Sequence, residues 1–338
     1  MKNQPLVSVI IPTFNRAHTV QRAISSVLNQ RYSNIQLIVV DDGSTDETRG
    51  LLEAMPDIEY VYQPNAGQAA ARNTGMSRAH GSLISSLDSD DYWTPDFLEI
   101  CVNQLCKYDL DFVFANWNQK SKYTGDWEDF LSADPFLRDY WSGGKNGWFF
   151  LDNEELRKLY LVACPSPSSS VLLRRDSIVD GWNCNLNIGD DWGLYLDMIL
   201  SKPCKVAFTL ERLWYKDIDG QNIYDGRARE EVVKLLLVED TNEILHKYQY
   251  ILTGDERKLL EQRYVEGLVE FGKYQLIRKG HWVDFCRRFT QAFSIDIRHS
   301  LVTVGKLMKS AVCNCYQRII DRTDYVKHVI EKDRSALN

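Results

Sequence analysis

The strongest constraint on the fold is an alternation of apolar, β-branched runs with helix-period segments along the first part of the chain. The predicted strands are Val7–Pro12, Ile35–Val40, Ile58–Tyr62 and Leu83–Leu87, and the predicted helices are Ala17–Asn29, a segment after Asp46, and Gln68–Arg78. Continuous hydrophobicity, as in Val39-Val40, suits parallel strands covered on both faces. The sequence therefore predicts an α/β fold built from βαβ units with right-handed crossovers.

Polar clusters follow three of these strands where they end. The clusters are Thr13-Phe14-Asn15, Asp41-Asp42-Gly43-Ser44 and Asp88-Ser89-Asp90-Asp91. Ligands of parallel sheets bind at the carboxyl ends of the strands. We therefore expect a binding site at this edge of the sheet.

The acidic cluster suggests a metal site. In an extended backbone, alternate side chains point to the same side, so Asp88 and Asp90 are expected to converge while Asp91 faces another way. Converging carboxylates raise one another's pKa unless a cation neutralises them, and hard divalent metals take oxygen ligands. The alternative is a solvated acidic turn before a helix that starts near Thr94-Pro95-Asp96.

A nucleotide ligand is suggested by residues at the same edge. The ring of Phe14 can stack on a base, and Asp41 and Asp42 can accept hydrogen bonds from base or ribose donors. Arg72, within the segment 65–75, can lie near a diphosphate; the alternative is an ordinary surface arginine. The absence of G-x-G-x-x-G after the first strand, and of G-x-x-x-x-G-K-[ST] anywhere, excludes the dinucleotide fingerprint and the P-loop.

Charge and composition narrow the partners. A net charge of -7 over 338 residues argues against nucleic acid as the principal partner. Eight cysteines without a C-x-x-C pair are typical of reduced thiols in a cytosolic protein. No stretch approaches the roughly 18 apolar residues of a membrane span. We therefore expect a cytoplasmic protein, in peripheral contact at most with the inner face of a membrane.

Two regions depart from the strand and helix alternation. Residues 117–151 are irregular and rich in aromatic residues, and we interpret them as an acceptor-side insertion whose rings serve mostly for packing, the alternative being a platform for sugars. Residues 227–338 are predicted to be helical, with helices Val232–Tyr248 and Glu256–Ile277. Basic residues mark the later part of that region: Lys273, Arg278, Lys279, Arg287, Arg288, Arg298, Lys306, Lys309, Arg318 and Arg322.

The basic residues of this tail alternate with aromatic and aliphatic side chains such as Trp282, Phe285 and Leu301. This pattern is typical of helices that lie on an anionic membrane surface or bind a partner chain. The alternative is the solvated outer face of a small helical bundle.

Together, the motifs resemble family 2 of the GT-A glycosyltransferases over roughly residues 5–215. The motifs are Pro12-Thr13-Phe14-Asn15-Arg16, Val40 to Asp46, Asn65 to Gly75, Leu87 to Asp91, Ser168 to Arg175 and Ile188-Gly189-Asp190-Asp191-Trp192. The resemblance implies a Rossmann-like, mostly parallel central sheet flanked by helices. It assigns residues 1–226 to a nucleotide-sugar glycosyltransferase domain and leaves 227–338 as an all-helical C-terminal extension.

The resemblance also implies an inverting sugar transfer from a nucleotide diphosphate sugar, with a UDP-sugar expected, to a glycan or lipid-linked acceptor. The resemblance implies that Asp191 is the general base and that Asp90 and Asp91 bind Mn²⁺ or Mg²⁺. The implied donor-binding residues are Pro12, Phe14, Asn15, Asp42, Arg72, Asp88 and Ser89. Supporting roles fall on Asp190, Trp192 and Lys216.

The chain departs from the family pattern at two places. Many members carry glutamate where this chain has Asp190, and many have a histidine downstream where Trp214 to Asp219 offers none, so Lys216 is the expected substitute. For Asp190-Asp191 the alternative is helix capping.

Two other functions compete with sugar transfer: a non-catalytic scaffold that binds sugar nucleotides or glycans, and nucleotidyl transfer.

Overall fold

The computed structural model describes residues 4–121, 124–141, 144–217 and 227–309. The chain divides into two compact units, Met1–Leu260 and Glu261–Asn338, and the division falls within helix α9 (Gly254–Lys279). The domain boundary predicted at 226–227 adjoins segment 218–226, which lies outside the described residues, and it stays a prediction.

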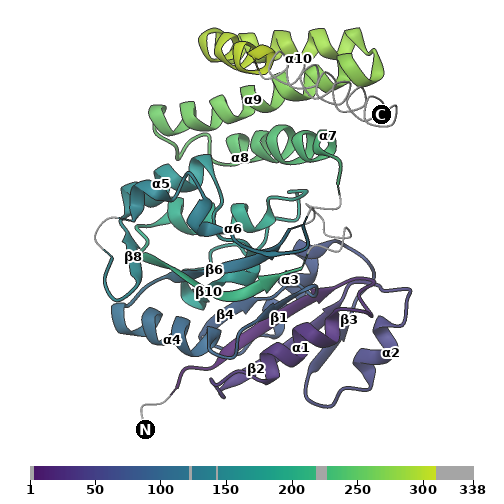
Figure 1. The fold of residues 1–338 in the computed structure, drawn as a ribbon, viewed down its shortest axis with the longest axis vertical. Helices are drawn as coiled ribbons and strands as arrows, with labels where there is room; N and C mark the ends of the chain where they lie inside the picture. The colour runs from purple at the N-terminus through teal and green to yellow at the C-terminus, as the bar shows by residue number, and fades with distance from the viewer. Residues whose placement is uncertain (1–3, 122–123, 142–143, 218–226, 310–338) are drawn as a thin grey trace, which may run out of the picture. The chain divides into compact units, whose positions relative to one another are not determined.

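The first unit is built on one mixed sheet with the strand order β3-β2-β1-β4-β9-β6-β10-β5, with β7 beside β6 and β8 beside β10 (Figure 1). The strands are β1 (Val7–Thr13), β2 (Ile35–Asp41), β3 (Glu59–Tyr62), β4 (Leu83–Ser86), β5 (Asp91–Trp93), β6 (Phe112–Lys120), β7 (Trp127–Asp129), β8 (Trp148–Leu151), β9 (Val171–Arg174) and β10 (Val206–Lys216). Strands β1 to β4 pair in parallel, as do β6 and β10, whereas β9 runs antiparallel between β4 and β6. The predicted central sheet with flanking helices is confirmed.

Among the described residues, six α-helices accompany the sheet. They are α1 (Val20–Leu28), α2 (Thr48–Glu53), α3 (Gln68–Arg78), α4 (Phe97–Tyr108), α5 (Asn153–Val162) and α6 (Asp190–Ser201). With this strand order, right-handed crossovers put α1 and α2 on one face of the sheet and α3 on the other. Helix α3 has the predicted bounds, and a 3-10 turn, Ser168–Ser170, leads directly into β9.

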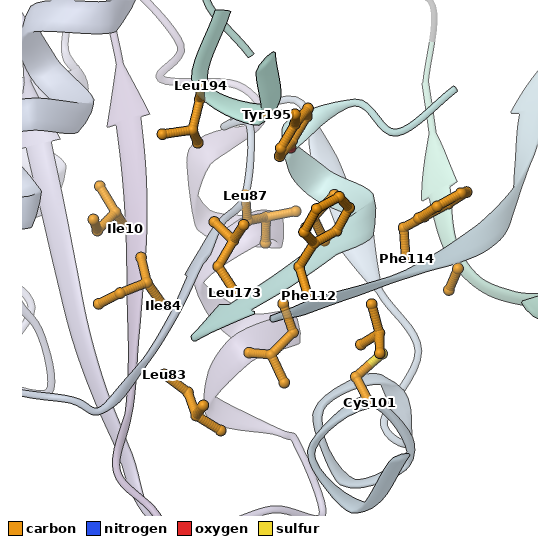
Figure 2. Packing of buried hydrophobic residues seen from close by; sticks show 14 of the residues in the cluster. Ile10, Leu83, Ile84, Leu87, Cys101, Phe112, Phe114, Leu173, Leu194 and Tyr195 are labelled. Carbon is orange, nitrogen blue, oxygen red and sulfur yellow. The ribbon is translucent and has the colours of Figure 1, made fainter. Parts of the chain in front are cut away.

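The core joins four neighbouring strands to helix α6. Ile10, Ile84, Leu173 and Phe112 come from β1, β4, β9 and β6, and all four are buried (Figure 2). The Phe112 ring stacks on Tyr195 of α6 at 5.5 Å between ring centroids. Each fully buried apolar side chain of this size contributes about 1.5–3 kcal/mol relative to exposure. Because this packing anchors α6 on the sheet, it also fixes where the first turn of α6 lies.

The segment 117–151 corrects one sequence expectation. Trp117 lies inside β6 and Trp148 begins β8, which pairs with β10, so both ends of the predicted insertion are strands of the central sheet. Glycines and aromatic residues in this segment hid the strand pattern. The expected packing role of the rings is confirmed for Trp117, which stacks on Trp214, and for Phe149, which stacks on Phe208. An acceptor-side role for this segment stays a prediction.

The described residues from 227 to 309 are mainly helical, as predicted. Helix α7 (Arg229–Val232), a π-helical segment (Val233–Asp240) and α8 (Thr241–Lys247) follow one another directly. Helices α9, α10 (Trp282–Ile295) and a helical stretch at 297–309 come next, whereas Arg318 and Arg322 of the basic tail lie outside the described residues. No helix in the described part of the chain combines the length and apolar character that crossing a bilayer requires.

Close packing of α3 on β1 depends on Gly75. A Cβ atom at this position would lie 2.4 Å from Cγ2 of Ile10, which is far inside van der Waals contact. Arg72 lies one turn earlier on the same helix. The glycine therefore sets how deeply the side chain of Arg72 enters the protein.

We expect Gly75→Ala to lower the free energy of unfolding by about 2 kcal/mol, because the added methyl group overpacks the contact with Ile10. Urea denaturation measures this change. Gly50→Ala in α2 is the matched control, since a Cβ there meets nothing within 4 Å and the helix propensity of alanine favours it. Equal stability of both variants would contradict this account of α3 packing.

Candidate active site

Several of the predicted site residues lie at the carboxyl ends of β1, β2 and β4. Phe14 comes directly after β1, and its ring is 43% exposed. Asn15 adopts a positive φ of 52°, and its Oδ1 accepts hydrogen bonds from the backbone N–H groups of Thr45 (2.8 Å) and Asp46 (3.3 Å). The backbone N–H of Asn15 donates to Oγ of Ser44 at 2.9 Å. These bonds hold the loops that follow β1 and β2 together.

Asp41 and Asp42 organise the next loop. Asp41 is fully buried and accepts from the Ser44 backbone N–H at 2.8 Å and from the Tyr60 hydroxyl at 3.2 Å. Asp42 accepts from Nε2 of Gln63 and from the backbone N–H groups of Ala66 and Gly67. Asp42 thus binds donors of the loop that leads into α3, whereas Asp41 binds the loop after β2 and a side chain of β3.

Arg72 lies at the centre of the site. Only 1% of its side chain is exposed, so the alternative of an ordinary surface arginine is wrong. Its guanidinium group contacts Oδ1 of Asp88 at 2.7 Å, Oδ1 of Asp191 at 3.3 Å and Oδ2 of Asp190. Its Nε donates to Oγ of Ser86 at 3.3 Å. One buried cation therefore joins the end of β4 to the first turn of α6.

The charge around Arg72 is unbalanced, because one guanidinium group faces three carboxyl groups. Burial by itself lowers the pKa of Arg72, but Asp191, Asp190 and Asp88 raise it above the ordinary value, so the group stays charged. Burial raises the pKa of Asp190 to about 7 against the lowering effect of Arg72, and the neighbouring carboxylates add to the rise. The excess of negative charge favours a further cation nearby.

The acidic cluster after β4 differs from the expected geometry in one respect. Oxygen atoms of Asp88, Asp90 and Asp91 all lie within 4.8 Å of one another, so Asp91 joins the other two. The prediction that it faces away is wrong because the backbone is not extended there. Strand β4 ends at Ser86, and the backbone N–H of Asp91 donates to the carbonyl of Asp88 at 3.0 Å, which closes a turn.

The residues of this cluster fit a hard divalent cation. Within the described ranges, Oδ1 of Asp91 is buried and has no hydrogen-bond partner, whereas its Oδ2 accepts from Oγ of Ser169 at 2.6 Å. Burial raises the pKa of Asp90 to about 6 and that of Asp91 well above its ordinary value, and the neighbouring carboxylates add to both. Arg16, whose Nε lies 3.7 Å from Oδ2 of Asp90, lowers the pKa of Asp90, and Lys216, opposite Asp91 in the β5–β10 register, lowers the pKa values of both acids. A bound cation would satisfy the orphaned oxygen and favour the ionised forms.

Asp191 contacts the Arg72 guanidinium group from the first turn of α6, and 19% of its side chain is exposed. Ser168 donates its hydroxyl to Oδ1 of Asp191 and its backbone N–H to Oδ2 at 2.9 Å. The indole N–H of Trp182 donates to Oδ1 at 3.3 Å. Trp192 is buried and donates to the carbonyl of Tyr160 at 2.5 Å, which ties the first turn of α6 to α5. The carboxylate of Asp191 is thus held in one orientation while it stays accessible.

Some residues of the site were not found by sequence reasoning. Ser168 and Ser169 are buried and bind Asp191 and Asp91, and Gln68 donates to Oδ1 of Asp190 at 2.7 Å. Three consecutive serines ahead of an apolar strand were the available signal for the first two. No local pattern marks Trp182, whose role depends on the tertiary fold.

Comparison with known proteins adds a family and a fold. The family model described as glycosyl transferase family 2 matches residues 8–178, about half of the chain. A UDP-Glc:alpha-D-GlcNAc-diphosphoundecaprenol beta-1,3-glucosyltransferase, WfgD of Escherichia coli, is 40% identical over 115 residues, which cover 33% of this chain and 46% of that protein. The chain spans less than half the length of the curated relatives it matches.

Two solved structures share the fold. TarS 1-349 of S. aureus in complex with UDP-GlcNAc has a TM-score of 0.60 at 17% identity, over 86% of this chain and 81% of that one. The mannosyltransferase PcManGT from Pyrobaculum calidifontis, in complex with GDP-Man and Mn²⁺, has a TM-score of 0.55 at 16% identity, over 92% and 81%. At these identities the likeness concerns the fold alone.

The raised pKa of Asp90 predicts a pH-dependent stability. A carboxyl group whose pKa rises on folding binds more protons in the folded state, so its burial destabilises the metal-free protein as pH rises from about 4 to about 6. In EDTA, we expect Asp90→Asn to raise the free energy of unfolding by about 2 kcal/mol at pH 8 and to change it little at pH 4.

Urea denaturation at both pH values measures this difference. Asp180→Asn, at a side chain that is 67% exposed, is the control and should follow the wild type at each pH. A stability gain for Asp90→Asn that is as large at pH 4 as at pH 8 would refute the assigned pKa.

Proposed function

The chain belongs to glycosyltransferase family 2, and from this membership we propose that it is an inverting, metal-assisted glycosyltransferase. It would move a sugar from a nucleotide diphosphate sugar to an acceptor hydroxyl. The observation that carries the proposal is the position of Arg72, which contacts Asp88 of the acidic cluster and Asp191 of α6 at the same time. The acids proposed to act on the leaving group and the acid proposed to act on the acceptor thus both adjoin Arg72.

The donor would bind along the ends of β1, β2 and β4. The exposure of Phe14 supports stacking on the base, and two proteins of the same fold form complexes with UDP-GlcNAc and GDP-Man. We propose a UDP-sugar as donor. The remaining donor contacts are assigned to Pro12, Asn15, Asp42, Arg72, Asp88 and Ser89.

Asp90 and Asp91 would hold Mn²⁺ or Mg²⁺, which neutralises charge on the departing diphosphate. The orphaned Oδ1 of Asp91 and the raised pKa of Asp90 support this assignment. Lys216 acts electrostatically on both carboxylates, which supports its proposed part in holding the diphosphate in place of the histidine found in many relatives.

Asp191 would act as the general base. Its Oδ1 already accepts from Ser168 and Trp182 and forms an ion pair with Arg72, whereas among the described residues its Oδ2 accepts one hydrogen bond, from the Ser168 backbone. A carboxylate oxygen has two lone pairs, so Oδ2 keeps an open acceptor position. The acceptor oxygen would bond to the anomeric carbon as the bond to the diphosphate breaks, and its proton would pass to Oδ2.

The acceptor would be a glycan or a lipid-linked glycan. The name of the Escherichia coli relative gives a diphosphoundecaprenol-linked sugar as its acceptor, and this supports the proposed class. A non-catalytic scaffold of the same fold would bind the donor and leave it intact. Turnover therefore decides between the two functions.

We expect the purified protein with Mn²⁺ to release nucleoside diphosphate from at least one sugar nucleotide in the presence of a lipid-linked glycan, and EDTA to stop the release. Asp191→Asn should lower kcat by about 10²- to 10⁴-fold and leave the donor dissociation constant nearly unchanged, because the amide cannot accept the proton. Coupled nucleotide release and calorimetry measure the two quantities.

Asp180→Asn serves again as the exposed control, with unchanged kcat. Donor binding without release across a panel of acceptors would favour the scaffold. Equal loss of donor affinity and kcat in Asp191→Asn would remove Asp191 from the role of base, and consumption of a sugar phosphate with formation of the nucleotide sugar would indicate nucleotidyl transfer.

We also propose that the second unit contacts an anionic membrane peripherally. In the helical stretch 297–309, Ile297, Leu301 and Met308 recur at helical spacing and are each about 60% exposed. Arg298 and Lys309 lie in the neighbouring row and are exposed as well. An apolar row beside a basic row is typical of helices that lie on a membrane surface, where each basic residue contributes about 1 kcal/mol.

We expect the protein to float with vesicles that contain anionic lipid and to remain in the dense fraction with neutral vesicles. The double variant Leu301→Glu/Met308→Glu should abolish flotation, because it places two negative charges in the apolar row. Val179→Glu, at an exposed apolar residue of the first unit, is the control and should float normally. Equal flotation of the double variant, or none of the wild type, would reject membrane contact in favour of a partner chain or a solvated face.

A further inference from the structure

Asp240, at the end of the π-helical segment, is a buried acid that the proposed reaction does not use. None of its surface is exposed, and no lysine, arginine or histidine within the described ranges forms an ion pair with it. Burying a carboxylate is costly unless hydrogen bonds compensate. The compensating donors of Asp240 all belong to one short loop, residues 187–189.

The loop donates to both oxygens of Asp240. Its Oδ1 accepts from the backbone N–H of Asn187 at 2.7 Å and from Nδ2 of the same residue at 2.9 Å. Its Oδ2 accepts from the backbone N–H groups of Ile188 at 2.9 Å and Gly189 at 2.8 Å. Hydrogen bonds of this kind, in which the acceptor is ionised, are about twice as strong as neutral ones.

This loop leads directly into the proposed catalytic turn. Gly189 is the N-cap residue of α6, and its backbone N–H, which has no acceptor within the helix, donates to Asp240. Asp190 and Asp191 are the next two residues. A Cβ atom on Gly189 would lie 3.3 Å from Oδ2 of Asp240 and 3.3 Å from Cδ1 of Leu236, so the contact is tight.

The helix that carries Asp240 is itself irregular. Residues Val233–Asp240 are π-helical between the α-helical segments α7 and α8, and the hydroxyl of Thr241 donates to the carbonyl of Leu236 at 3.0 Å. Single π-helical turns inside α-helices occur frequently at functional sites.

We propose that Asp240 is a positioning residue for sugar transfer, an inference that depends on the proposed function. By holding three successive backbone groups of the loop, it sets the direction in which the first turn of α6 begins. Asp190 then meets Arg72 and Gln68, and Asp191 meets Ser168 and Trp182. Asp240 acts on the reaction through the backbone and touches neither donor nor acceptor.

The test compares Asp240→Asn with Glu243→Gln, which removes one charge from the same helical run in α8 without a bond to the loop. Asparagine keeps the shape but offers one acceptor oxygen, and its NH₂ group faces backbone donors. Because a misplacement of about 1 Å can cost about 10²-fold in rate, we expect kcat to fall by about 10²-fold in Asp240→Asn with donor KM within about twofold of wild type.

Hydrogen–deuterium exchange gives a second readout that does not depend on activity. Exchange at residues 187–189 should become faster in Asp240→Asn and stay unchanged in strand β1, and Glu243→Gln should resemble the wild type in every measurement. If Asp240→Asn fails to fold, Gly189→Ala tests the same contact, because its Cβ presses on Asp240, and it should show the same split between kcat and donor KM.

A kcat within threefold of wild type for Asp240→Asn, or unchanged exchange at 187–189, would overturn the inference. Equal losses of kcat and donor affinity, together with faster exchange in β1, would also overturn it, because they indicate general loosening. A wild type that transfers no sugar would instead overturn the proposed function and the catalytic part of the inference, while the exchange data would still decide whether Asp240 holds the loop.

Discussion

The arrangement of this site depends on one buried guanidinium group. Arg72 brings together carboxyl groups from Asp88, after β4, and from Asp190 and Asp191, at the start of α6, although these lie about a hundred residues apart in the chain. Removing one partner of a buried ion pair leaves an uncompensated charge, so the members of such a cluster hold one another in place. Close packing of α3 at Gly75 and of α6 on Phe112 delivers both ends of the cluster to the same point.

Much of the fold could be predicted because its signals are local. Continuous apolar runs marked β1, β2 and β4, and the bounds of α3 were predicted to the residue. The polar clusters at the strand ends were also visible, since parallel strands present their carboxyl ends at one edge. The region 117–151 was harder to predict. A strand whose buried side chains are aromatic, such as β6 with Trp117 stacked on Trp214, has a sequence pattern similar to that of an irregular aromatic loop.

The details of the site depended on contacts that no local pattern encodes. Asp91 turns toward Asp88 because the backbone closes a turn there instead of continuing as a strand. Arg72 is buried because acids from a distant helix surround it, and a helix position alone does not distinguish it from a surface arginine. Ser168 and Asp240 act through backbone bonds to segments 23 and about 50 residues away, so only the tertiary fold identifies them.

The π-helical turn before Asp240 also restricts how this chain can change length. An α-helix advances by about 100° per residue, so the deletion of one residue between 233 and 239 would restore regular α-helical winding and rotate Asp240 away from the loop that it holds. Insertions and deletions in surface helices are usually absorbed at their ends. Here Asp240 couples the register of the π-helical segment to the start of α6. The length of this segment is therefore less free to vary than its place outside the central sheet suggests.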